Sequence, residues 1–273
     1  MKRIILSICF ISMAFSQGVI QQFEKGSINY SDQTISAIGI GFVPENVINA
    51  GQARRSALRI AKADALRQLI EIVNGVTLTS ETVMSGAMLD DVIKTRVEGL
   101  IRGARQIGSP SYLSDTSVEV EYQVPMSSIS EIILPVPSIA AGTSAIPAVT
   151  GTAAPPPPAA GGITGLIIDA RGVGLRPAMA PRVLDQNGNV IYGPGNYSRE
   201  YAVTNGVAGY SKTLEAARAD ARVQGNPLIV KCVASSGTNR ADMVVSNADI
   251  SKINSADRSF NILRDCRVLI LLD

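Results

Sequence analysis

The chain has 273 residues, of which 25 are lysine or arginine and 23 are aspartate or glutamate, and it contains no histidine and no tryptophan. Without histidine, the Ser-His-Asp and Cys-His arrangements of nucleophilic catalysis and the HExxH zinc site are excluded. The near-neutral charge balance also argues against a basic surface for nucleic acid.

The N-terminus has the pattern of a signal peptide. Lys2 and Arg3 precede an apolar run of about a dozen residues, which is shorter than the roughly 20 that span a bilayer. Small residues before the junction predict cleavage between Ser16 and Gln17, so that residues 1–16 are removed. An uncleaved membrane anchor is the alternative.

The exported chain is expected to be close to neutral. Its leader holds two of the 25 basic residues and no acidic ones, so 23 basic residues remain against 23 acidic ones. Cys9 does not fit a lipidation site, because the bulky Ile8 precedes it inside the apolar run. No later segment has the length and apolarity of a transmembrane helix. We therefore expect a periplasmic protein, soluble or peripheral to the outer membrane.

Residues 17–32 are predicted to be a weakly ordered lead-in to a first domain over residues 33–134. A strand is expected over 35–42 and a helix over 49–73, where apolar residues recur every three or four positions. Asn74 and Gly75 give the stop signal. The apolar set of this helix is Leu58, Ala61, Ala65, Leu69 and Ile72.

The rest of the first domain is expected to add a strand over 76–83, a helix over 88–100 and a hairpin of strands 106–113 and 117–124. The helix carries Leu89, Val92, Ile93, Val97 and Leu100 as its apolar set, and the second hairpin strand alternates, with Val118, Val120, Tyr122 and Val124 on one face. The pattern predicts an α/β sandwich, with helices on one face of a mostly antiparallel sheet.

Residues 135–162 consist mainly of proline, alanine, glycine, serine and threonine, including PAVTGTAAPPPPAAGG. Such a composition favours extended polyproline II and cannot bury a core. We predict a semi-rigid linker between two domains.

A second α+β domain of the same sandwich type is predicted over residues 163–273. An Asn-Gly pair between 182–184 and 190–192 indicates a hairpin. Ser211 is expected to cap a helix reaching about Gln224, and Ser246 or Asn247 a shorter one. Strands are expected over 228–234 and 243–246, and the terminal CRVLILLD is apolar enough for a central strand.

Two cysteines remain after the leader, Cys232 and Cys266, both in predicted strands. In an oxidising periplasm they could form a disulfide, which would stabilise the fold by roughly 3–4 kcal/mol. Two buried free thiols are the equal alternative, since the strand register decides between them. No CxxC motif is present.

Other polar motifs are interpreted structurally. DQNGN, residues 185–189, lacks the carboxylate and glycine spacing of a calcium loop and is a turn. Gly172-Val173-Gly174 lacks the third glycine of a dinucleotide loop and is a bend, beside the charged pair of Asp169 and Arg171. Glu81, Asp90 and Asp91 could form a carboxylate cluster, but Asp90-Asp91 better suit a helix N-terminus, where the dipole favours negative charge. No catalytic residue, metal ligand or cofactor site is predicted.

Residues 38–124 resemble a known family. The glycine-bearing first strand, the AxRxAxxxAxxxL-type helix ending in NGV, the Ser80-Glu81-Thr82 strand and the helix closing on Gly99 to Gly103 are similar to the flagellar H-ring FlgT N-terminal domain and FlgP-like outer-membrane lipoprotein family. The resemblance implies envelope assemblies such as rings or disks and no catalytic residues. The missing lipidation cysteine departs from the lipoprotein members. The second domain resembles a region of bacterial exported proteins without an associated activity.

Two functions follow as hypotheses. The first is a non-enzymatic structural protein of the cell envelope that self-associates or joins a machine such as the flagellar basal body. The alternative is a periplasmic small-ligand binding module or minor hydrolase that uses the second domain, which a deep pocket with inward carboxylates would favour.

Overall fold

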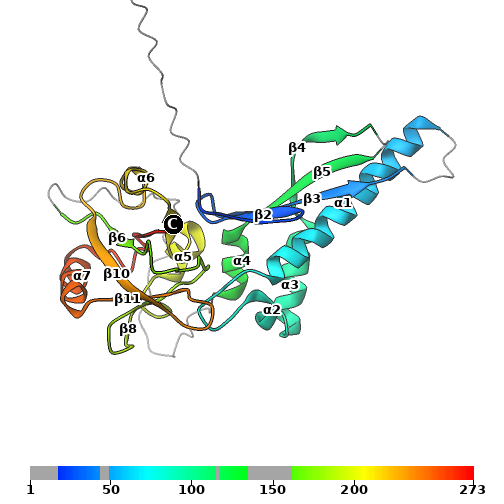
Figure 1. The fold of residues 1–273 in the computed structure, drawn as a ribbon. Coiled ribbons are helices and arrows are strands. Elements are labelled where there is room, and N and C mark those ends of the chain that lie inside the picture. The colour runs from blue at the N-terminus through cyan, green and yellow to red at the C-terminus, as the bar shows by residue number, and fades with distance from the viewer. Residues whose placement is uncertain (1–17, 44–48, 115–116, 135–161) are drawn as a thin grey trace, which may run out of the picture.

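The computed structural model describes residues 18–43, 49–114, 117–134 and 162–273. These residues form an α+β protein of two domains, the first built on a five-stranded sheet and the second on a seven-stranded sheet (Figure 1). The predicted leader 1–16 with its cleavage site at Ser16 and Gln17, and all of the predicted linker before Gly162, lie outside the described residues.

The first sheet has the order β1-β2-β3-β5-β4, and its neighbouring strands run antiparallel. The prediction of a weakly ordered lead-in is wrong, because that segment forms a hairpin that joins β3. The hairpin was not predicted because its strands are mostly polar and lack an alternating pattern. Ile28 is the one buried residue of these two strands. The strands are β1 (Ile20–Phe23), β2 (Gly26–Asn29), β3 (Thr34–Gly41), β4 (Arg105–Tyr112) and β5 (Val118–Pro125).

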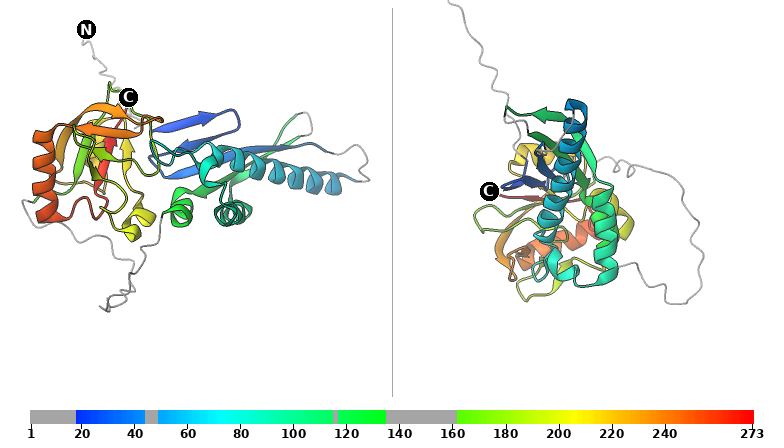
Figure 2. Two further views of the ribbon diagram at one scale, coloured as in Figure 1. Left: turned by 90° about the horizontal axis from the view of Figure 1, so that it is seen from below. Right: turned by 90° about the vertical axis from the view of Figure 1, so that its right-hand side faces the viewer.

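Helix α1 (Ala50–Asn74) lies along the sheet, as the left view of Figure 2 shows. Asn49 begins it by accepting a hydrogen bond from the N–H of Gln52, and it ends at Gly75, as predicted. Its buried face repeats small residues, so the helix axis can approach β3 closely. The buried residues are Ala57, Ala61, Ala65, Leu69, Ile72 and Val73.

The strand predicted over 76–83 is absent from the described chain. Its residues form a loop held by a single bridge between Thr77 and Val83. Short α2 (Met84–Ala87) follows, then α3 (Asp91–Arg102), whose N-terminus is capped by Asp90. Because α3 begins later than predicted, its buried face is formed by Val97 and Ile101. Leu89 and Val92, predicted as core, are instead 85% and 60% exposed.

The predicted hairpin is confirmed as β4 and β5, with Val118, Val120, Tyr122 and Val124 buried. A further helix, α4 (Met126–Ile133), closes the domain and was not predicted. It buries Met126 and Ile129.

The second sheet has the order β8-β7-β11-β10-β6-β12-β9. The expectation of a mostly antiparallel sheet is wrong here: β6 pairs parallel with β10 and β12, β12 with β9, and β11 with β7. Parallel strands need both faces covered, and β12 is buried at every position. The strands are β6 (Leu166–Asp169), β7 (Val183–Leu184), β8 (Val190–Tyr192), β9 (Gly209–Ser211), β10 (Leu228–Ser236), β11 (Asp242–Val245) and β12 (Val268–Leu271).

The helices of the second domain are α5 (Arg199–Asn205), α6 (Leu214–Ala219) and α7 (Asn247–Phe260). α5 was not predicted, since seven residues are too few to show a period. The helix expected from Ser211 is shorter, because Ser211 belongs to β9 and Thr213 provides the cap. α7 is capped by Ser246, as predicted.

The side chain of Asp64 binds a backbone N–H of β3 at the edge that β2 leaves unpaired. β2 accompanies β3 only as far as Ala37, and the N–H of Ile40 donates to Oδ2 of Asp64 at 3.0 Å. Nη2 of Arg67 and Nζ of Lys25 lie 2.7 and 4.0 Å from the carboxylate. Burial alone would raise the pKa of Asp64, but these hydrogen bonds and cations outweigh it and lower the pKa.

We expect Asp64→Asn to lower the free energy of unfolding by about 1 kcal/mol near neutral pH. Because the pKa of Asp64 is lower in the folded than in the unfolded state, the carboxylate stabilises fully above the unfolded value of about 3.9, and its contribution is lost as pH falls through the folded pKa. Urea unfolding of both proteins over an acid pH series measures this. A difference that stays constant down to the most acidic pH would contradict it.

Candidate functional site at the domain interface

The loop after α1 inserts into the second domain. We call residues 77–82 the interdomain loop. The backbone N–H groups of Met179 and Ala180 donate to the carbonyl oxygens of Thr77 and Leu78 at 2.9 and 2.8 Å. Two segments about a hundred positions apart in the sequence are thus joined by main-chain hydrogen bonds, which do not depend on side-chain rotamers.

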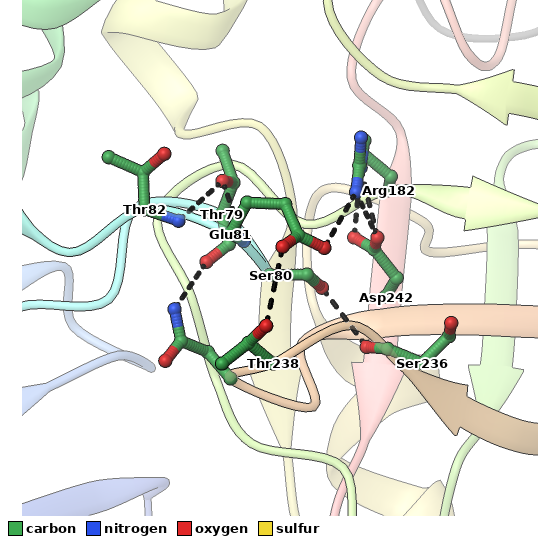
Figure 3. A network of polar contacts seen from close by, with 9 residues as sticks. Thr79, Ser80, Glu81, Thr82, Arg182, Ser236, Thr238 and Asp242 are labelled. Atoms are coloured by element: carbon green, nitrogen blue, oxygen red, sulfur yellow. Dashed lines mark hydrogen bonds and ion pairs between the residues drawn. The ribbon is translucent and has the colours of Figure 1, made fainter.

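Ser80 is the most buried part of this loop, with no exposed surface. Its Oγ donates to the carbonyl of Ser236 at 3.1 Å (Figure 3). Its carbonyl accepts from the N–H of Asn239 at 2.8 Å. The amide of Asn239 also donates to the carbonyl of Thr79 at 3.2 Å. Gly237, with φ of +81°, is required here, because a Cβ at that position would lie 2.1 Å from Cβ of Ser80.

A buried ion pair lies beside the loop. Nε of Arg182 donates to both carboxylate oxygens of Asp242, at 3.1 and 3.0 Å, and Nη2 also donates to Oδ2. The Asp242 side chain is 1% exposed, so its buried negative charge needs a compensating positive charge. The guanidinium group of Arg182 supplies it. Hydrogen bonding to Asp242 raises the pKa of Arg182. Oε1 of Glu81 lies 3.9 Å from Nη2 of Arg182, which links the pair to the first domain (Figure 3).

A second contact joins the β1–β3 region to β9. The rings of Tyr30 and Tyr210 meet edge to face with centroids 5.6 Å apart, and Oγ of Ser31 donates to the carbonyl of Tyr210 at 2.9 Å. The hydroxyl of Tyr210 is held by both backbone groups of Ala178. Burial raises the pKa of both tyrosines, so they remain neutral hydrogen-bonding groups.

A third contact joins α4 to α5. Arg199, at the start of α5, donates to the carbonyl oxygens of Leu134 and Glu131 at 3.2 and 2.6 Å. These are carbonyls at the end of α4, where a cation is favoured by the helix dipole. Three separate contacts therefore fix the second domain against the first.

An apolar cavity of about 320 Å³ lies between the domains, and the interdomain loop forms part of its wall. Its walls include Leu78, Ile93 and Ile133 from the first domain and Met179 and Tyr197 from the second. No acidic or basic residue lines it. The cavity suits an apolar group and lacks the inward carboxylates that a hydrolase would use.

The cysteines are both free and buried in the structure. Cys232 lies on β10, while Cys266 lies in the turn before β12 and not in a strand as predicted. Strand β6 separates β10 from β12. Burial raises the pKa of the Cys266 thiol to about 11 and also raises that of Cys232, so neither is an activated nucleophile.

We expect neither Cys232 nor Cys266 to react with iodoacetamide in the folded protein, because both are buried and protonated. Both should react after unfolding without reductant. Intact mass spectrometry counts the adducts on the folded and on the unfolded protein. Failure of both to react in denaturant until reductant is added would show a disulfide instead.

The turn motifs are confirmed as turns. The carboxylate of Asp185 accepts from backbone N–H groups of Asn187 and Asn189 at 2.8 Å, closing the β7–β8 hairpin. Arg171 donates to Asp169 at 2.8 and 2.6 Å at the glycine bend. Among the described residues, no three His, Cys, Asp or Glu side chains are grouped to hold a metal ion.

Residues 165–273 match the family model of the second domain of Treponema pallidum Tp0624, a stretch that contains all strands of the second sheet. No curated protein matches the chain. No helix in the described ranges combines the length and apolar character needed to cross a membrane.

Ser80 and Glu81 were part of a motif in the sequence, but they were predicted to lie in a strand. Arg182, Asn239 and Asp242 were missed, because their partners lie in distant segments. One signal was available: Asp242 directly precedes the apolar run MVV, where a buried carboxylate needs a cation.

Proposed function

We propose that this protein is a non-enzymatic, exported structural protein of the cell envelope, which assembles with copies of itself or with other envelope proteins. We place it at the flagellar basal body or the outer membrane. The signal-peptide pattern supports export, and the resemblance over residues 38–124 supports the site of assembly. The proposal does not depend on any catalytic residue.

The observation that carries the proposal is the buried interdomain loop. Ser80 makes hydrogen bonds in both directions across the interface, and the loop backbone pairs with Met179 and Ala180. Most of the buried apolar residues of both domains also belong to one apolar cluster. A scaffold benefits from such fixed geometry, since it must hold its binding surfaces at constant positions.

The test is fractionation and crosslinking in the host bacterium. Cells expressing the tagged full chain should contain it in periplasmic or outer-membrane fractions, crosslinked to envelope proteins. A chain beginning at Gln17 is the matched control, and it should stay in the cytoplasm. Wild-type protein confined to the cytoplasm, or exported without any crosslinked partner, would overturn the proposal.

The apolar cavity favours a second candidate, the binding of a small apolar ligand between the domains. A medium-chain alcohol such as decanol should then raise the melting temperature. Ala87→Leu, which adds a larger side chain to the cavity wall, should abolish that shift. No shift with the wild-type protein would contradict this candidate and leave the structural role unaffected.

A further inference from the structure

One end of the first domain projects away from the second domain, as the left view of Figure 2 shows. We call this part the arm. It contains the last half of β3, the β4–β5 hairpin and the first half of α1, or residues 38–42, 50–63, 105–112 and 118–121. Its sheet has α1 on one face only in the described chain, because Gly39 and Gly41 point at α1 and the alternate residues point away.

The outward sheet face of the arm combines apolar and acidic side chains. In register across β3 and β5, Ile38 lies opposite Glu121 and Ile40 opposite Glu119. Ile107 on β4 also lies opposite Glu121. Within the described residues neither glutamate has an ion-pair partner, so both charges are available.

Phe42 and Leu113 extend the apolar part of this surface at the end of the arm. Phe42, directly after β3, is 61% exposed, and Leu113, directly after β4, is 43% exposed. Large apolar side chains gathered at one end of a projecting element are typical of an interaction surface.

The outer side of α1 in the arm is basic. Residues 50–63 include four basic side chains and no acidic one. Arg54 and Lys62 lie over the rings of Tyr112 and Tyr122, at 4.4 and 5.6 Å from their centroids. Arg55 and Arg59 point away from the sheet, are exposed, and have no ion-pair partner in the described chain.

The spacing of the two sets of charges matches. Glu119 and Glu121 are two strand residues apart, which is about 7 Å. Arg55 and Arg59 are four helix residues apart, which is about 6 Å along the axis. Two carboxylates on one copy can therefore face two guanidinium groups on another at the same time.

We propose that the arm is a self-association surface, in which the outward sheet face of one copy packs on the outer side of α1 of a second copy. The proposal rests on the proposed function and names its contact surface. Glu119 and Glu121 pair with Arg55 and Arg59, while the apolar side chains around the glutamates cover the helix. The apolar contact supplies most of the affinity, and the charges select the partner face.

The two surfaces lie on opposite sides of the same arm, so the contact is head to tail. Every copy then offers one surface of each kind to a neighbour. Such a heterologous contact produces a closed ring or an open filament, depending on the rotation between copies.

The experiment uses the protein purified in its exported form and two charge-reversed variants. The helix variant is Arg55→Glu with Arg59→Glu, and the sheet variant is Glu119→Arg with Glu121→Arg. Light scattering over a concentration series measures mass. The wild type should associate, and each variant alone should associate at least tenfold more weakly. A 1:1 mixture of the two variants should recover association, as should one chain carrying all four changes.

Lys94→Glu with Arg96→Glu is the matched control, because it reverses two exposed charges on α3 outside the arm. It should associate as the wild type does. Circular dichroism and melting temperatures establish that each variant is folded, and the recovery arms exclude simple misfolding.

Three results would overturn the arm contact. They are a wild type that stays monomeric at every concentration, variants that associate like the wild type, and a four-change chain that does not recover. A monomeric wild type that still crosslinks to envelope proteins would leave the proposed function intact. The helix variant could also keep the mass of the wild type and yet no longer crosslink to envelope proteins. That result would assign the basic side of α1 to a different partner.

Discussion

Gly41→Ala is expected to destabilise the protein by about 3 kcal/mol, at the upper end of the cost of overpacking. A Cβ on Gly41 would lie 2.0 Å from the carbonyl oxygen of Ala57 and 2.5 Å from the backbone nitrogen of Ala61. These are backbone atoms in the middle of a helix, so no rotamer change relieves the contact. The variant folds only if α1 is lifted from β3, which uncovers the apolar core beneath it. Urea unfolding measures the loss.

Gly99→Ala is the matched control for this prediction. Gly99 lies inside α3, and a Cβ there meets no atom within 4 Å. Alanine is the better helix former, so this variant should gain about 1 kcal/mol. The same substitution is thus expected to lower the free energy of unfolding at Gly41 and to raise it at Gly99. Equal stability of the two variants would contradict the close seating of α1 on β3.

The sequence permits this part of the fold to be predicted and also shows where prediction ends. The alanine period of α1 and the alternation of β5 are local patterns, and both elements formed as expected. In the sequence, Gly39 and Gly41 are visible only as two glycines inside a predicted strand. Their actual role is to admit α1, and it becomes visible only when helix and strand are placed together.

Long-range pairing is what local patterns could not supply. The apolar run at the C-terminus correctly predicted a central strand, β12. Its parallel neighbours β6 and β9 are separated from it by helices, and strand direction leaves no period in the sequence. The early hairpin of β1 and β2 was missed for a different reason, because its exposed polar residues hide the alternation on which strand prediction depends.

The candidate site was the least predictable feature. Residues 76–83 have the composition of a strand. Their backbone nevertheless does not enter the first sheet, and instead accepts hydrogen bonds from the N–H groups of Met179 and Ala180. Tertiary contacts with the second domain therefore override local propensity. The separation of β10, which carries Cys232, from β12 by the intervening β6 is a long-range property of the same kind.

Arg182→Met is expected to lower the free energy of unfolding by about 3 kcal/mol, since removing one partner of a buried ion pair leaves the other charge uncompensated. The Asp242 carboxylate, 1% exposed, would lose its bonds to the guanidinium group. The side chain of Arg182 is itself 28% exposed, which keeps the loss at the lower end of the range for buried pairs. Chemical denaturation measures the loss. Hydrogen exchange of the Asn239 N–H, which donates to the carbonyl of Ser80, should also accelerate, because Arg182 links Asp242 to Glu81 of the interdomain loop.

Two further variants separate the ion pair from a general effect of losing an arginine. Arg171→Met removes an exposed pair with Asp169 and should cost less than about 1 kcal/mol. The double variant Arg182→Met with Asp242→Leu removes both buried charges, and it should recover much of the stability lost by Arg182→Met alone. If the double variant is less stable than either single one, the contribution of Arg182 comes from packing of its stem and not from its charge. If Arg182→Met leaves exchange of the Asn239 N–H unchanged, the main-chain bonds to Met179 and Ala180 are sufficient to hold the domains together.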